Sequence, residues 1–224
     1  MIKLVIFDLD GTVFDAYKAV CKSLNYALAK FGYSELTLEQ VKRSVGHGER
    51  NLLLKFVSED KVDEVQSLYR EYGADHFTEL VTLLPAAKET LEWLHKQGYK
   101  VAVATNRPGW SARMVLDILK IADWFDYIVC GDEVLNVKPD PEIVFKILDH
   151  FKLFKEEAIF VGDMDLDIQT GKSAGVKTFA VPTGSCYKEE LVSAGPDHLA
   201  NSLAELPEYI LTLPLVGRGR GGAK

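Results

Sequence analysis

Leu4-Val5-Ile6-Phe7-Asp8-Leu9-Asp10-Gly11-Thr12 is the segment that indicates the fold most clearly, because a short apolar run leads directly into two carboxylates. An unbroken run of four apolar residues, rich in β-forming side chains, predicts a strand that is buried on both faces. Similar runs follow at residues 101–104, 127–130, 158–161 and 178–181, with helical segments between them. This alternation predicts an α/β fold in which helices cover a parallel sheet.

Proline and glycine predict where two of these helices begin and end. Pro85 fits a first-turn position, and Gly98 follows the apolar face of the same segment as a stop. Pro141 similarly predicts the start of a helix that runs to about His150.

One interval breaks the alternation, because residues 14–82 contain helical periodicities and no good strand run. Thr37 and Gln40 fit a capping box at the start of one of these helices. We therefore expect an inserted all-helical cap over residues 14–82. Residues 1–13 and 83–216 would form the catalytic core, followed by a flexible basic tail over residues 217–224.

Composition narrows the possible partners. The 224 residues carry 26 Lys and Arg against 33 Asp and Glu, a net charge of −7, which weighs against a protein-wide surface for nucleic acid or anionic membrane. No charge-free apolar run approaches the roughly 18–20 residues of a membrane helix, and no signal-peptide core is evident. Three scattered cysteines without a CxxC spacing fit a cytoplasmic protein. A monomer or a small homo-oligomer both remain open.

Aspartates gather where the predicted strands end. Asp8 and Asp10 follow the first strand, and Asp163 and Asp167 follow the run at residues 158–161. Each pair alone could be only a turn or a helix cap. If the two strands are neighbours, however, four carboxylates share one crevice at the carboxyl edge of the sheet. A hard divalent cation would relieve their repulsion, and oxygen-only ligands favour Mg²⁺.

Two further segments supply groups that a phosphate would need. Thr105 and Asn106 follow the run at residues 101–104, and Lys138 lies in a proline-flanked loop before a helix. Taken singly, Thr105 reads as a cap and Lys138 as a surface lysine. Together with Mg²⁺, they offer the hydrogen-bond donors and the positive charge that bind a phosphate dianion.

These motifs, in this order, resemble those of the haloacid dehalogenase superfamily, in particular its phosphatase branch. The resemblance rests on Asp8-Leu9-Asp10-Gly11-Thr12, Thr105-Asn106, Lys138-Pro139, and Gly162-Asp163 with Asp167, and it spans nearly the whole chain. The helical insertion resembles the cap of the phosphoglycolate phosphatase and β-phosphoglucomutase subgroup. The resemblance implies a Rossmann-like core.

The resemblance also implies a role for each motif residue. Asp8 would be the nucleophile that forms an aspartyl-phosphate, and Asp10 the general acid and base. Thr105, Asn106 and Lys138 would bind the phosphoryl group, and Lys138 would also offset the charge on Asp8. The Mg²⁺ site would comprise Asp8, Asp10 through its backbone carbonyl, Asp163 and, in a supporting position, Asp167.

The cap would select the substrate. The loop Gly46-His47-Gly48-Glu49-Arg50 resembles the substrate-facing cap loop of the family, and we expect His47 or Arg50 to contact the leaving group. An ordinary polar surface loop is the alternative.

The expected activity is Mg²⁺-dependent hydrolysis of a small phosphorylated metabolite, led by phosphoglycolate-type substrates. A β-phosphoglucomutase-like phosphotransferase is the main alternative, although that group usually has a His shortly after the first motif and the first candidate here is His47. A haloacid dehalogenase would not be expected to keep Asp10. A non-catalytic phosphate-binding module would be expected to have lost Asp8 or Asp10.

Overall fold

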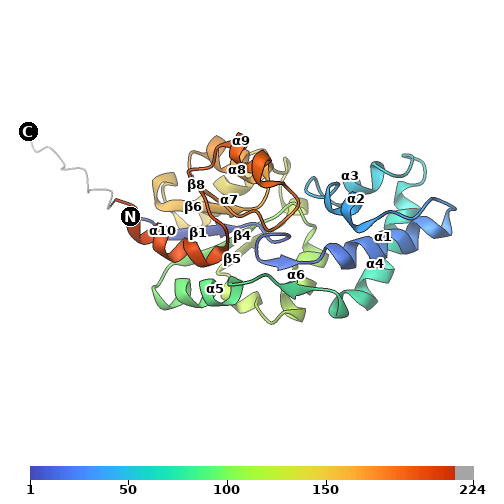
Figure 1. Cartoon of the computed structure of the whole chain (residues 1–224), viewed down its shortest axis with the longest axis horizontal. Coiled ribbons are helices and arrows are strands. Elements are labelled where there is room, and N and C mark those ends of the chain that lie inside the picture. The colour runs from blue at the N-terminus through green and yellow to red at the C-terminus, as the bar shows by residue number, and fades with distance from the viewer. Residues whose placement is uncertain (215–224) are drawn as a thin grey trace, which may run out of the picture.

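The computed structural model describes residues 1–214, so the predicted basic tail over residues 217–224 lies outside the described part. Its centre is a six-stranded parallel sheet in the order β5-β4-β1-β6-β7-β8 (Figure 1). The strands are β1 (Leu4–Phe7), β4 (Lys100–Ala104), β5 (Tyr127–Val129), β6 (Ala158–Gly162), β7 (Lys177–Ala180) and β8 (His198–Leu199). The predicted α/β fold is confirmed. The edge strand β8, which the sequence did not reveal, has only two residues and is too short to produce a pattern.

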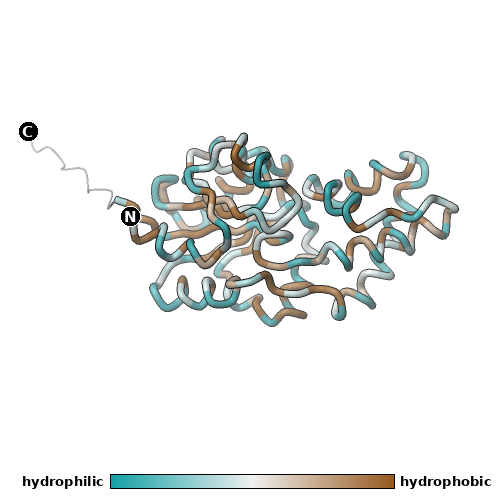
Figure 2. Tube along the Cα trace, in the orientation of Figure 1, coloured by the Kyte–Doolittle hydropathy of each residue, from teal (hydrophilic) through white to brown (hydrophobic). Residues whose placement is uncertain are grey.

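Alternate residues of each strand point to opposite faces of the sheet, and each face has its own core. Val5 and Phe7 of β1 pack in one core with helices α5 (Ala87–Lys96), α6 (Gly109–Ile118) and α10 (Leu206–Thr212). Leu4 and Ile6 pack in the other with helices α7 (Glu142–Phe151) and α8 (Asp165–Ala174). Figure 2 shows apolar residues along the central strands. Burial on both faces explains why these strands are continuously apolar.

Helix boundaries agree with the proline signals in one case of two. Pro141 immediately precedes α7, as predicted. Pro85, in contrast, lies outside its helix, because Ala86 takes a left-handed conformation (φ 64°) and α5 begins only at Ala87. The remaining helical elements of this part of the chain are α9 (Lys188–Ala194), η2 (Ala122–Trp124), η3 (Gly131–Glu133), η4 (Lys155–Glu157) and η5 (Leu203–Glu205).

Four helices form a lobe at the end of the molecule opposite the N-terminus (Figure 1). They are α1 (Tyr17–Lys30), α2 (Leu38–Lys42), α3 (Glu49–Leu54) and α4 (Val62–His76), followed by the short η1 (Phe77–Glu79). We call residues 17–79 the α1–α4 lobe. It encloses its own apolar core, which includes Leu24 and Leu53. The Thr37–Gln40 capping box is present, which confirms that prediction.

Two short strands connect the lobe to the sheet. β2 (Phe14–Asp15) and β3 (Thr82–Leu83) pair antiparallel, so the chain enters and leaves the lobe side by side. Within residues 1–214, no helix combines the length and the apolar character needed to cross a bilayer.

Candidate active site

The sheet topology brings the motif residues together. β1 lies between β4 and β6, and all three strands run parallel. Asp8, Thr105 and Asp163 each directly follow one of these strands and therefore lie at the same edge of the sheet. This is the crevice that the sequence predicted.

Gly11 allows the loop after β1 to turn tightly beside Asp163. Its φ of 81° is in the left-handed region that favours glycine. A Cβ atom built on Gly11 would lie 2.6 Å from Asp163 Oδ2 and 2.4 Å from the Tyr17 hydroxyl, which leaves no room for a side chain. The next residue, Thr12, donates a 2.9 Å hydrogen bond from Oγ1 to Asp163 Oδ1.

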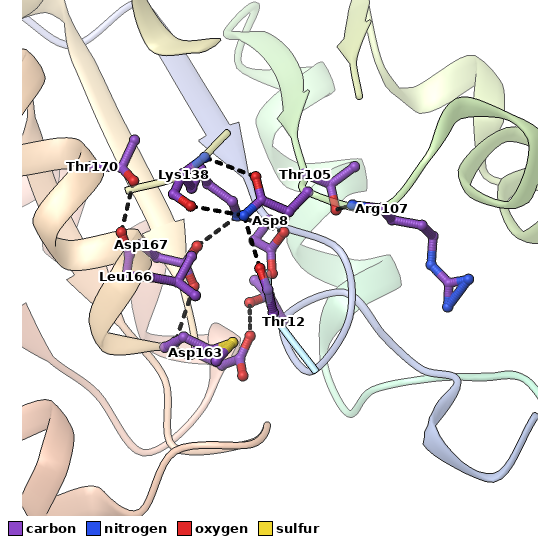
Figure 3. A network of polar contacts seen from close by, with 12 residues as sticks. Asp8, Thr12, Thr105, Arg107, Lys138, Asp163, Leu166, Asp167 and Thr170 are labelled. Carbon is purple, nitrogen blue, oxygen red and sulfur yellow. Dashed lines mark hydrogen bonds and ion pairs between the residues drawn. The ribbon is translucent and has the colours of Figure 1, made fainter. Parts of the chain in front are cut away.

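Lys138 joins two of three buried carboxylates (Figure 3). Its Nζ donates to Asp8 Oδ1 at 2.8 Å and to Asp167 Oδ1 at 2.6 Å. Asp8, Asp163 and Asp167 each offer one oxygen within 4.8 Å of the others. Burial lowers the pKa of Lys138, but the attraction of Asp167 and Asp8 outweighs that effect and leaves the pKa raised. Lys138 therefore remains a cation inside the protein.

One lysine does not balance three carboxylates. The pKa of Asp163 is raised well above its ordinary range, mainly by burial and to a smaller extent by repulsion from Asp167 and Asp8. Burial also raises the pKa of Asp167 to about 6, although Lys138 partly offsets the effect. With all three carboxylates ionised, the site would carry excess negative charge, which a further cation would neutralise in place of protons.

Asn106 positions Lys138. Its Oδ1 accepts a hydrogen bond from the Lys138 backbone N–H at 2.9 Å, and its Nδ2 donates to the Lys138 carbonyl at 3.0 Å. The same Nδ2 donates to the Gly46 carbonyl in the α1–α4 lobe at 2.8 Å. The Asn106 side chain is thus already committed within the protein, and only its backbone N–H fits the predicted phosphate contact. Thr105 is buried and lines the pocket described below.

Asp10 is paired with Arg107, which the sequence analysis did not single out. Arg107 Nε donates to Asp10 Oδ2 and Nη2 donates to Asp10 Oδ1, each at 2.8 Å. Burial raises the pKa of Asp10, and the Arg107 guanidinium partly offsets this rise. A lone arginine in a loop normally indicates a solvated side chain. The available signal was its position directly after Thr105-Asn106.

The sheet edge and the α1–α4 lobe enclose one pocket with a cavity of about 80 Å³. Residues after the strands supply its polar floor, and the helices supply much of its roof. The floor includes Asp8, Asp10, Thr105, Arg107 and Lys138, and the roof includes Val20, Val45, Glu49, Leu52 and Tyr69.

The two lobe residues predicted to contact the substrate do not line this pocket. The loop instead presents Gly46, Gly48 and Glu49. Arg50 forms ion pairs with Glu59 and Asp63 on the exposed side of the lobe. His47 is likewise absent from the lining, because the turn at residues 46–48 brings backbone rather than these side chains toward the site.

Known proteins share this sequence and architecture. A family model described as haloacid dehalogenase-like hydrolase matches residues 5–181. A phosphoglycolate phosphatase from Pseudomonas fluorescens is 32% identical in an alignment 229 residues long, which covers 95% of this chain and 83% of that protein. The pyrophosphatase PpaX from Bacillus cereus is 34% identical over 205 residues, which cover 92% and 94%. A crystal structure described as a predicted phosphoglycolate phosphatase from Haemophilus somnus has a TM-score of 0.89 at 26% identity, covering 93% of this chain and 98% of that one.

Proposed function

Because this chain belongs to the haloacid dehalogenase-like hydrolases and is a phosphatase, we propose that it hydrolyses a small phosphate ester through a phosphorylated Asp8, with Mg²⁺ as cofactor. The family match confirms the resemblance indicated by the motifs. The observation that carries the proposal is the buried group of Asp8, Asp163 and Asp167 around Lys138, in contact with a pocket that Asp10 also lines.

The residues present fit Mg²⁺. Asp8 and Asp163, together with the backbone carbonyl of Asp10, would hold the ion, with Asp167 beside them. All the donors are oxygens, which this hard cation prefers. Within the described part of the chain, the buried hydroxyls of Tyr17 and Ser185 have no hydrogen-bond partner, and the Ser185 backbone N–H donates to Asp163 Oδ2 at 3.0 Å. Unpaired hydroxyls beside a carboxylate suit a hydrated cation.

In the first step, Asp8 attacks phosphorus. A bond forms between a carboxylate oxygen of Asp8 and phosphorus, the bond from phosphorus to the leaving oxygen breaks, and Asp10 donates a proton to that oxygen. Thr105 and the Asn106 backbone N–H would hold the phosphoryl oxygens. Lys138 would offset the negative charge on Asp8 and the phosphoryl group. Mg²⁺, when bound, neutralises further charge on the phosphoryl oxygens.

In the second step, water hydrolyses the phosphorylated Asp8. Asp10, now a carboxylate, accepts a proton from the attacking water. The bond between phosphorus and the Asp8 oxygen breaks, which releases phosphate and restores the Asp8 carboxylate. A raised pKa of Asp10 suits this alternation, because the side chain must carry the proton in one step and lose it in the other.

The preferred substrate is a compact phosphate ester whose leaving group carries a negative charge. The small cavity favours a small leaving group. The name of the Pseudomonas relative points to phosphoglycolate. Pyrophosphate is a second candidate, favoured by the match to PpaX. We further propose that residues 14–82 act as a cap that opens and closes on the segments carrying β2 and β3.

A phosphate-release assay on small esters tests the proposal. We expect Asp8→Ala to abolish turnover while the protein stays folded, because the covalent route needs this carboxylate. Asp117→Ala, on the exposed face of α6, is the matched control and should keep wild-type activity. We also expect EDTA to remove activity, and Mg²⁺ but not Ca²⁺ to restore it. Wild-type turnover by folded Asp8→Ala would refute the mechanism.

A further inference from the structure

Arg107 is a buried cation in the floor of the pocket. Its side chain is only 7% exposed, and its guanidinium carbon lies 5.8 Å from the Phe14 ring centroid and 5.6 Å from that of Phe77. Two of its nitrogens bond Asp10. A guanidinium has five N–H groups in a planar fork, so Asp10 uses only part of its donor capacity. In the described part of the chain, Arg107 Nη1 makes no hydrogen bond to a protein acceptor.

The other charged groups that line the pocket are already paired. Lys138 is committed to Asp8 and Asp167. Glu49 accepts hydrogen bonds from Arg70 Nε at 2.6 Å and from Trp110 Nε1 at 3.1 Å. Lys138 has three N–H donors, and the one not used on Asp8 and Asp167 is assigned to the phosphoryl group in the proposed mechanism. Among the cations described as lining the pocket, Arg107 is therefore the one with donors left for the leaving group.

The position of Asp10 locates the leaving group. In the proposed mechanism, Asp10 gives its proton to the leaving oxygen, so the leaving group must lie next to the Asp10 carboxyl. Arg107 bonds both oxygens of that carboxyl and therefore lies on the same side of the pocket. Once Asp10 has given up this proton it is a carboxylate, and an anionic leaving group would then meet its repulsion unless a cation were beside it.

We propose that Arg107 binds the anionic end of the leaving group, a carboxylate or a phosphate, and is the residue that selects such substrates. This inference rests on the proposed function and takes over the role that the sequence assigned to His47 or Arg50. A neutral leaving group gains nothing from Arg107, which then remains paired with Asp10 alone. The fork geometry suits both candidate anions, because it can donate two parallel hydrogen bonds to either.

The test compares matched substrates. 2-Phosphoglycolate and ethylene glycol monophosphate differ only in a carboxylate against a hydroxymethyl group, and pyrophosphate supplies the phosphate leaving group. For each substrate with an anionic leaving group, we divide its kcat/KM by the kcat/KM for ethylene glycol monophosphate, whose leaving group is neutral. We expect Arg107→Met to lower this ratio at least about tenfold. A fall for phosphoglycolate alone identifies a carboxylate as the bound anion, and a fall for pyrophosphate alone identifies a phosphate.

Two further variants keep the test decisive. Arg107→Lys retains a cation, which should preserve folding, but it lacks the planar guanidinium fork. We therefore expect it to lower the same ratio of kcat/KM values at least about threefold. Arg113→Met, which removes a half-exposed arginine paired with Glu133 outside the pocket, should leave the ratio unchanged. If Arg107→Met and Arg107→Lys lower kcat/KM equally on all substrates, Arg107 only positions Asp10 and the inference is overturned. If the wild type hydrolyses none of them, the proposed function fails as well.

Discussion

Replacing Lys138 with methionine should destabilise the metal-free protein strongly, because the substitution removes the one cation that the buried carboxylates share. Lys138 is 1% exposed, and its partners Asp8 and Asp167 are 8% and 1% exposed. Methionine fills a similar volume, so the main loss is the charge. Removing one partner of a buried ion pair costs about 3–5 kcal/mol. At about 2–4 °C per kcal/mol for a chain of this size, the melting temperature should fall by roughly 6–20 °C.

The loss should depend on pH. A buried carboxylate whose pKa is raised in the folded state favours folding below its unfolded pKa, and this advantage is lost as pH rises through the folded pKa. The pKa of Asp167 is already about 6 with Lys138 present, and without the lysine it should rise further. At pH 5 the carboxylate binds a proton and needs no cation, so the difference between variant and wild type should be smaller than at pH 8.

Thermal unfolding followed by circular dichroism in EDTA, at pH 5 and pH 8, measures both effects. Lys146→Met is the matched control, because Lys146 is exposed on α7 and its Nζ donates only to the Glu133 carbonyl. It should change the free energy of unfolding by less than about 0.5 kcal/mol. Two results would show that Lys138 does not neutralise the buried carboxylates. One is a Lys138→Met protein that melts within about 1 °C of wild type at pH 8, and the other is a fall in melting temperature that is larger at pH 5 than at pH 8.

Three further outcomes are expected. Mg²⁺ at about a hundred times its dissociation constant should raise the free energy of unfolding by about 2.7 kcal/mol. In melting scans this stabilisation should grow from pH 5 to pH 7.5, because protons compete with the ion for Asp167 below the Asp167 pKa of about 6. A stabilisation that does not change with pH would contradict this prediction. Gly184→Ala should abolish the Mg²⁺ response, because its Cβ would lie 1.7 Å from Asp163 Oδ2, whereas Gly98→Ala, with nothing within 4 Å, should keep it. Arg43→Met should lower the free energy of unfolding by less than about 1 kcal/mol, because the ion pair between Arg43 and Glu190 is partly exposed, and this difference should vanish in 1 M salt. A larger loss of stability that persists in 1 M salt would indicate that Arg43 acts through packing.

Features that depend only on residues close together along the chain were predictable from the sequence. Buried strands such as residues 4–7 and 158–162 are apolar throughout, so a single pass along the chain predicts them. The Thr37–Gln40 capping box closes within one helical turn and is equally local. Motif residues that directly follow strands could be placed at one edge of the sheet, because parallel strands end on the same side.

The pairing of side chains within that edge depends on contacts between distant loops and became visible in the folded protein. Lys138 lies 130 residues from Asp8, and Arg107 lies 97 residues from Asp10. The local sequence around Lys138 or Arg107 does not indicate either contact, because an isolated lysine or arginine in a loop is ordinarily solvated. The same limit explains His47 and Arg50: a polar loop beside a predicted pocket can turn either its side chains or its backbone inward. In the folded protein Gly46, Gly48 and Glu49 line the pocket, whereas Arg50 forms ion pairs with Glu59 and Asp63 on the surface.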